Sequence, residues 1–195
     1  YDTDIRLNDP KLGVISSGVF ISIAEKSAKI NELIKWAVEE ACNTILYLKK
    51  RHRFTGEFFM FLSVKSLLKK NFSDNVARIV HKCSVETNEI CFVISENIFS
   101  FHTERVADAL FELHELGFKI ALGNFGSESI NLSALQRLEV DYIFLSPEFV
   151  SDVLTSVRAK KIVSSVIELG NKLDITIIAD GVVNKEQAKE LFNMG

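Results

Sequence analysis

Proline is scarce in this sequence: Pro10 and Pro147 are its two examples in 195 residues. No stretch rich in serine and glycine divides the chain either, so nothing in it has the composition of a linker. We therefore expect a single domain over residues 1–195. A chain of this length can bury a core without disulfides or bound metals.

Cysteine is equally sparse, and its number is odd. Cys42, Cys83 and Cys91 form no Cys-x-x-Cys pair. This pattern excludes a disulfide framework and a structural zinc site, and it is typical of buried thiols in a reducing compartment.

Long apolar runs and an excess of one charge are also missing. No stretch of 18 apolar residues is present, so we expect no membrane insertion by this segment. Lys and Arg number 23 against 26 Asp and Glu, a net charge of -3. Without a basic field, binding to the phosphates of nucleic acid is not expected.

The chain begins at Tyr1 without a methionine and runs directly into the strand-like segment YDTDIRL. Its first residues do not have the pattern of a signal peptide. We therefore expect a fragment of a longer polypeptide. Its expected location is the cytoplasm, either free or as the cytoplasmic module of a membrane-attached protein.

Short apolar segments alternate with segments of helical periodicity. The expected strands are 3–7, 57–64, 89–95, 119–122, 142–145 and 175–179. The expected helices are 20–29, 31–51, 73–81, 104–116, 132–138, 157–169 and 185–194. A loop is expected over 12–20, because Asn8-Asp9-Pro10 should end the first strand.

In the expected helix 31–51, Asn31 is placed to cap the start, and Trp36, Cys42 and Ile45 fall on one face that should be buried. Polar and apolar residues do not alternate along the expected strands, which predicts an α/β fold with a parallel sheet covered by helices on both faces. A barrel and an open sheet both fit, and both place functional groups at the carboxyl ends of the strands. No glycine-rich dinucleotide motif or P-loop follows any strand.

The segment RLNDPKLGVISSGVFISIAE resembles the opening of EAL domains, bacterial phosphodiesterases that linearise cyclic di-GMP. The residues that match the family pattern in register are Arg6, Pro10, Gly13, Phe20, Ile21, Ala24 and Glu25. The resemblance continues through VISEN, the NFG turn, LEVDYIFLSPEFV and IIADGVVNKEQ, and so spans the chain. It implies a TIM-like (β/α) barrel of the EAL type with one antiparallel strand, here lacking the first and last strands.

The resemblance also implies which residues should carry the chemistry. The family hydrolyses its phosphodiester with two divalent cations held by carboxylate and amide oxygens, and a lysine and a glutamate assist. In this sequence the metal-ligand and lysine positions are occupied by Asp2, Phe61, Val93, Gly123, Asn124, Phe144, Ser146 and Asp180. Asp2 and Asp180 keep a carboxylate, on a side chain one methylene shorter than the glutamate of the family pattern. We therefore expect no metal site, no cofactor and no phosphodiesterase activity.

Two functions are then open. The first is a regulatory domain that acts through a protein partner, which the apolar Phe61 and Phe144 favour by filling the site. The second is a metal-independent receptor for cyclic di-GMP. Its candidate binding residues are Asp2, Arg6, Phe125, Gly126, Glu148, Asp180 and Gly181. We favour the first.

Several candidates have a structural alternative. Arg6 could pair with Asp2, Asp4 or Glu96, and Phe125 could pack in the interior. Glu96 is expected to stabilise a loop, as in the family. The resemblance also places a homodimer surface near residues 127–138, so a homodimer is open as well.

Overall fold

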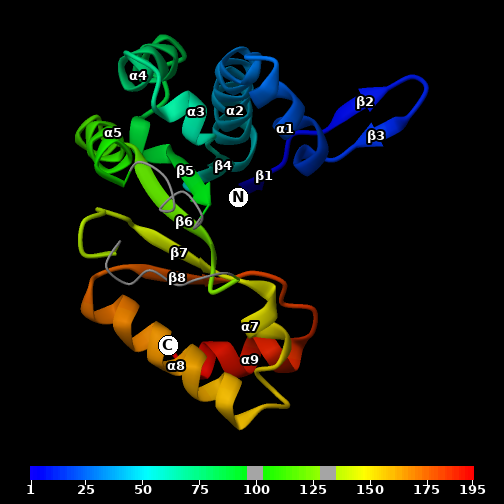
Figure 1. The fold of residues 1–195 in the computed structure, drawn as a ribbon, viewed down its shortest axis with the longest axis vertical. Coiled ribbons are helices and arrows are strands. Elements are labelled where there is room, and N and C mark those ends of the chain that lie inside the picture. The colour runs from blue at the N-terminus through cyan, green and yellow to red at the C-terminus, as the bar shows by residue number, and fades with distance from the viewer. Residues whose placement is uncertain (96–102, 128–134) are drawn as a thin grey trace. The chain divides into compact units, whose positions relative to one another are not determined.

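The computed structural model describes residues 1–95, 103–127 and 135–195, and the chain forms two compact units (Figure 1). Unit 1 comprises Tyr1–Val93 with Glu104–Lys119, and unit 2 comprises Ile94–Thr103 with Ile120–Gly195. The units are described one at a time below.

Unit 1 contains parallel strands in the order β1, β4, β5. Their bounds are β1 (Asp2–Thr3), β4 (Phe58–Phe61) and β5 (Ile90–Ser95). The register pairs Asp2 with Phe59 on one side of β4 and Phe61 with Val93 on the other. Parallel strands end at the same edge, so the residues at their carboxyl ends become neighbours.

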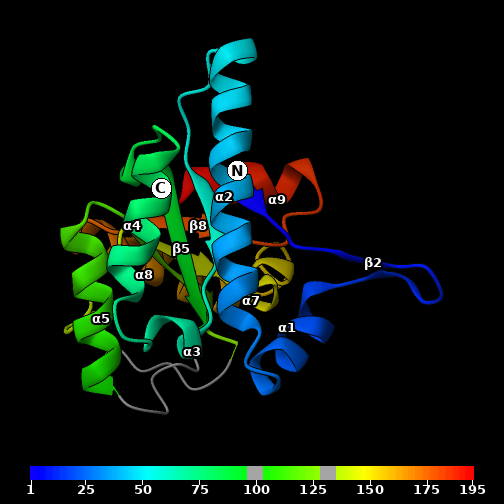
Figure 2. The same ribbon diagram turned by 90° about the horizontal axis from the view of Figure 1, so that it is seen from above.

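Helices cover these strands. They are α1 (Ser17–Lys26), α2 (Ile30–His52), α3 (Val64–Leu67), α4 (Phe72–Lys82) and α5 (Thr103–Glu115), with a 3-10 turn at Thr87–Glu89. The long α2 packs on α4, and its buried residues are Ile30, Ile34, Ala37, Val38, Ala41, Cys42 and Ile45 (Figure 2).

Two predictions for α2 are wrong. Trp36 is 50% exposed, because the buried face follows Ile34, Val38 and Cys42 and leaves the indole on the opposite side. Asn31 lies in the first turn of the helix and does not cap it, since Lys29 holds the cap position.

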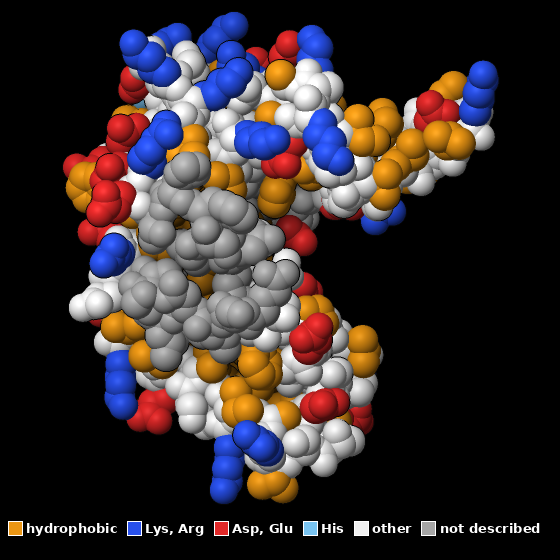
Figure 3. Space-filling model, viewed as in Figure 1, with side chains coloured by type: hydrophobic (Ala, Val, Ile, Leu, Met, Phe, Trp, Pro, Cys, Tyr) orange, Lys and Arg blue, Asp and Glu red, His pale blue; other side chains and the backbone are white. Residues whose placement is uncertain are grey.

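The predicted loop over residues 12–20 is also wrong. The chain forms an antiparallel hairpin of β2 (Leu7–Asp9) and β3 (Gly13–Ile15), followed at once by α1. Pro10 lies in the turn, where it needs no backbone donor. The Asp9 carboxylate closes that turn by accepting from the backbone N–H groups of Lys11 and Leu12 at 2.8 and 2.9 Å. Apolar side chains gather on this hairpin (Figure 3).

Unit 2 contains a second parallel set in the order β6, β7, β8. The strands are β6 (Lys119–Phe125, in unit 2 from Ile120), β7 (Tyr142–Leu145) and β8 (Thr176–Ala179). The strand predicted to stop at Leu122 runs on to Phe125 through a register shift. The helices are α7 (Pro147–Ser151), α8 (Val157–Lys172) and α9 (Lys185–Asn193). Close packing of α8 on β8 requires Gly170, because a Cβ there would lie 2.7 Å from Ile177.

The alternation of parallel strands and covering helices predicted from the sequence is confirmed within each unit. Residues 132–134 of the predicted helix 132–138 and residues 128–134 of the dimer segment 127–138 lie outside the described residues. Among the described helices, none is both long and apolar enough to cross a bilayer.

Candidate functional site at the strand tips

Two apolar side chains stand side by side at the strand tips of unit 1. Phe61 ends β4 and pairs in register with Val93 on β5, and the Leu62 N–H donates to the Val93 carbonyl at 2.9 Å. The Phe61 side chain is 37% exposed. Neither residue has a side-chain oxygen, so this part of the edge cannot ligate a hard cation.

The carboxylate at this edge comes from Asp2, which is exposed and two residues before Asp4. Asp2 pairs in register with Phe59, the residue two before Phe61 on β4. Side chains alternate along a strand, so Phe59 and Phe61 share a face of the sheet. Asp2, the register partner of Phe59, lies on the neighbouring strand β1.

A second carboxylate near the end of β4 is already engaged. The Ser63 hydroxyl, which is 1% exposed, donates to Glu25 Oε1 at 2.5 Å. This bond ties α1 to the end of β4. The sequence showed Glu25 as a family match without indicating this partner, because the two residues are 38 positions apart.

Arg6 lies outside the strands and is largely exposed. Its Nε donates to Asp4 Oδ2 at 3.2 Å, with side-chain exposures of 69% and 44%. Of the three ion-pair partners considered from the sequence, the structure gives Asp4. Glu96 lies outside the described residues, so the loop-stabilising role expected of it stays a prediction.

The strand tips of unit 2 are joined by backbone hydrogen bonds. The Ser146 N–H donates to the Phe125 carbonyl at 3.1 Å, and the Asp180 N–H donates to the Leu145 carbonyl at 3.2 Å. These bonds place the ends of β6, β7 and β8 in one row. Phe144 lies on β7 opposite Ile178 of β8, so its neighbour on that side is apolar.

The side chains in this row offer few ligand atoms. Asp180 and Asn124 are exposed, and Asn124 has a left-handed backbone with φ 57°. Gly123 is buried, and so is the Ser146 hydroxyl, which has no hydrogen-bond partner among the residues that the structure describes. Of the substituted ligand positions in unit 2, Asp180 is therefore the one that has a carboxylate.

Three candidate binding residues of unit 2 are packed against their own unit. Phe125 is 2% exposed, so its ring lies in the interior. Gly126 has φ +92°, and a Cβ there would lie 1.7 Å from the Phe149 ring. A Cβ on Gly181, with φ +76°, would lie 2.8 Å from Pro147.

These glycines therefore allow close packing of α7 on the neighbouring loops. Glu148, also on α7, is exposed.

The described residues do not fit a pair of divalent cations. Such a pair needs several oxygen ligands in each coordination shell. The substituted positions supply one carboxylate in unit 1, from Asp2, and one in unit 2, from Asp180. Asn124 adds an amide oxygen and Ser146 a buried hydroxyl, while Phe61, Val93 and Phe144 supply no oxygen. Over residues 1–95, 103–127 and 135–195, no group of three or more His, Cys, Asp or Glu is placed to hold a metal ion.

Comparison with known proteins matches the family model "EAL domain" to residues 1–195. The chain is 24% identical over 186 residues to the oxygen sensor protein DosP of Escherichia coli. This alignment covers 95% of this chain and 23% of DosP. It spans between 23% and 30% of the length of the first curated relatives.

Two solved structures show the same fold. One is the MucR phosphodiesterase of Pseudomonas aeruginosa in a c-di-GMP complex, with a TM-score of 0.89 and 25% identity over 100% of this chain and 78% of that one. The other is the FimX EAL domain of the same species bound to c-di-GMP, with a TM-score of 0.87 and 21% identity over the same shares. The TIM-like barrel of the EAL type is thereby confirmed as the fold class.

Proposed function

Because the chain belongs to the EAL domain family, we propose that it is a non-catalytic EAL domain that regulates a partner through protein–protein contact. One observation carries the proposal. At adjacent strand tips, Phe61 and Val93 stand in register where the family pattern has an amide and a carboxylate ligand.

The loss of ligands is concerted, which is why it removes the reaction. A single missing ligand could be replaced by water or by a neighbouring oxygen. Here apolar side chains replace ligands on two strands of unit 1, and Phe144 replaces the family lysine in unit 2. Groups that act as one catalytic unit lose activity together, so no partial hydrolysis is expected.

The fold, in contrast, is kept. Gly126 and Gly181 still allow α7 to pack on the neighbouring loops, and Ser63 still joins β4 to α1. A scaffold retained without its ligands is consistent with a role that depends on surface shape. The proposed location is the cytoplasm, and the lack of a disulfide at Cys42, Cys83 and Cys91 among the described residues is consistent with it.

A metal-independent receptor for cyclic di-GMP is the second candidate. MucR and FimX carry that ligand in the structures named above. The observation that favours this function here is Arg6. Its guanidinium is exposed and makes one exposed ion pair, so it remains available to a phosphate. Against it, the Phe125 ring is buried and cannot stack on a base.

Incubation with cyclic di-GMP in MnCl₂, followed by chromatography of the products, tests the loss of catalysis. No linear dinucleotide should form, while an active EAL phosphodiesterase assayed alongside should produce it. Turnover that disappears in Asp2→Ala would refute the proposal.

Isothermal titration with cyclic di-GMP in EDTA separates the two candidates. The proposed function predicts no binding heat. Micromolar binding that is lost in Arg6→Ala and kept in the matched control Arg78→Ala would establish the receptor instead. Arg78 is exposed on α4, so its removal takes away the same charge.

A further inference from the structure

The β2–β3 hairpin forms a sheet of its own within unit 1. Its strands pair with each other and, over the residues that the structure describes, with no third strand. In both ribbon views the hairpin extends away from α2 (Figures 1 and 2). A two-stranded hairpin by itself is marginally stable in water, so a further strand would stabilise it.

Apolar side chains are exposed along this part of the chain. Leu7, Leu12 and Val14 of the hairpin are between 47 and 76% exposed. The helix α1 follows directly, and none of its residues, all of which are described, is buried. Val19 and Ile23 lie one turn apart on α1, and each is more than half exposed. Exposed apolar residues gathered in one segment are typical of an interaction site.

The backbone of the hairpin indicates what kind of partner fits it. In an antiparallel pair, every second residue of each strand directs its N–H and C=O groups away from the other strand. In the described part of the chain, no backbone–backbone hydrogen bond runs from β2 or β3 to another element. An incoming strand would pair with these outward groups, whereas a helix would leave them unpaired.

The two edges of the hairpin are not equivalent. The β2 edge is bordered by Arg6 and Pro10 and ends on Asp9, and charges and prolines are the residues that prevent strand addition. The β3 edge consists of Gly13, Val14 and Ile15, which carry no charge and keep all their backbone N–H groups. The β3 edge is therefore the one open to a further strand.

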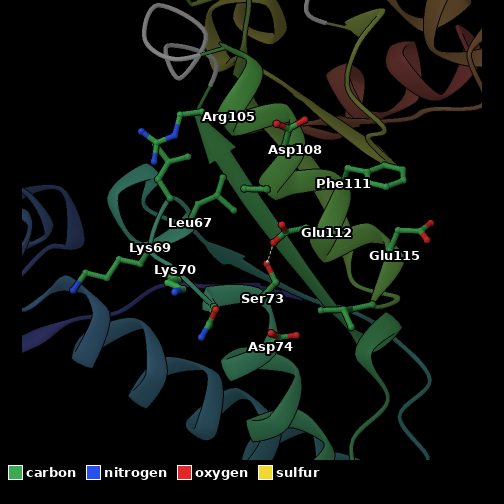
Figure 4. A pocket seen from close by; sticks show the side chains of 14 residues that line it. Leu67, Lys69, Lys70, Ser73, Asp74, Arg105, Asp108, Phe111, Glu112 and Glu115 are labelled. Atoms are coloured by element: carbon green, nitrogen blue, oxygen red, sulfur yellow. Dashed lines mark hydrogen bonds between the residues drawn. The ribbon is translucent and has the colours of Figure 1, made fainter.

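A groove of about 680 Å³ between the α3–α4 segment and α5 offers no comparable selectivity (Figure 4). Each of its sides mixes charges, since Arg105 lies on α5 with Asp108, and Asp74 lies on α4 close to Lys70 in the chain. Such a lining favours neither an acidic nor a basic partner.

We infer that β3 binds an extended apolar segment of the regulated protein, which adds to the hairpin as a third strand. The inference rests on the proposed function and names the surface through which that contact is made. Successive residues of a strand face opposite sides, so Val14 and Ile15 meet the incoming strand on different faces. A segment with β-branched apolar residues on both faces therefore fits, and its backbone pairs with that of β3.

Random octapeptides displayed on phage are the probe, and the chain is the bait after binders to Val14→Lys have been removed. Enriched peptides should be rich in valine and isoleucine and poor in proline. A lysine on the edge strand should weaken their binding by roughly tenfold or more. The control Val157→Lys makes the same change at a residue of α8 that is 74% exposed, and it should leave binding unchanged.

Two N-methylated forms of an enriched peptide test strand addition on the wild-type chain, so this arm does not depend on the folding of a variant. The methyl groups are placed on alternate residues, in the two possible phases. One phase removes the N–H groups that face β3 and should abolish binding, whereas the other removes those that face solvent and should preserve it. Amide hydrogen exchange should slow at residues 13–15 on binding and stay unchanged in α2.

Failure to enrich any peptide would overturn the inference. Equal binding of the two N-methylated forms would overturn it too, and so would protection elsewhere without protection at residues 13–15. None of these results affects the proposed loss of catalysis, which the MnCl₂ assay tests separately. Formation of linear dinucleotide in that assay would instead refute the proposed function and leave the strand addition standing.

Discussion

Burial raises the pKa of the Cys42 thiol from 9.0 to about 12, and the neighbouring Cys83 thiol shifts it in the same direction. Cys42 lies on the buried face of α2 and is 0% exposed, whereas Cys83 follows α4 and is partly accessible. The thiolate of Cys42 is thus disfavoured in the folded chain, which makes this residue a packing group and not a nucleophile.

Because unfolding lets Cys42 ionise at its ordinary pKa, stability should depend on pH in a defined direction. The contribution of the protonated Cys42 thiol to the free energy of unfolding is complete below pH 9.0 and is lost as the pH rises toward 12. Between pH 9.5 and 10.5, the free energy of unfolding should fall by up to about 1.4 kcal/mol per pH unit more steeply than in Cys42→Ala. Urea titrations of both proteins measure this difference, and parallel curves would contradict it.

Among the helices, α9 shows how a single polar side chain holds an element in place. The Asn184 Oδ1 accepts from the Gln187 N–H at 2.8 Å, and the Gln187 Oε1 accepts from the Val183 N–H at 3.0 Å. The amide of Gln187 also donates to the Val150 carbonyl at 3.4 Å, and the residue is 5% exposed. Asn184 therefore caps α9, and Gln187 fastens the start of the helix to Val183 and to α7.

Replacing Gln187 with alanine should destabilise unit 2. The backbone groups of Val183 and Val150 would lose a partner, a cost of about 1–3 kcal/mol. Lys189→Ala on the exposed side of the same helix should cost less than about 0.5 kcal/mol. Thermal and urea unfolding of the two variants compare these costs, and equal losses would mean that the side-chain bonds of Gln187 contribute nothing.

For the molecule as a whole, the question is whether divalent cations still stabilise the fold. A ligand present at a hundred times its dissociation constant stabilises the native state by about 2.7 kcal/mol. In a chain of this size that corresponds to a rise of about 5 °C or more in melting temperature. We expect the substituted strand tips to give Mn²⁺ no such site.

We therefore expect 5 mM MnCl₂ to change the melting temperature by less than about 1 °C relative to EDTA, with ionic strength matched by KCl. Differential scanning fluorimetry measures this directly. A rise of several degrees, abolished in Asp180→Ala, would show that the carboxylates at the tips still hold a cation.

Much of the fold was predictable, because it depends on local pattern. The apolar segments at 142–145 and 175–179 predicted β7 and β8 within one residue. The predicted helix 104–116 matches α5 within one residue, and Gly117 after it has the positive φ of 86° that is typical of a helix end. The hairpin at Leu7–Ile15 was missed because Pro10 and Gly13 mark a turn equally well whether or not the flanking residues pair.

The substituted ligand positions stay a prediction from the family resemblance, but the chemistry of the side chains at those positions does not depend on the fold. Phe61, Val93 and Phe144 lack an oxygen in any conformation. Tertiary structure alone decided which residues meet. It paired Phe61 with Val93, joined Glu25 to Ser63, and buried Phe125. Contacts between distant residues depend on packing, which no local pattern encodes.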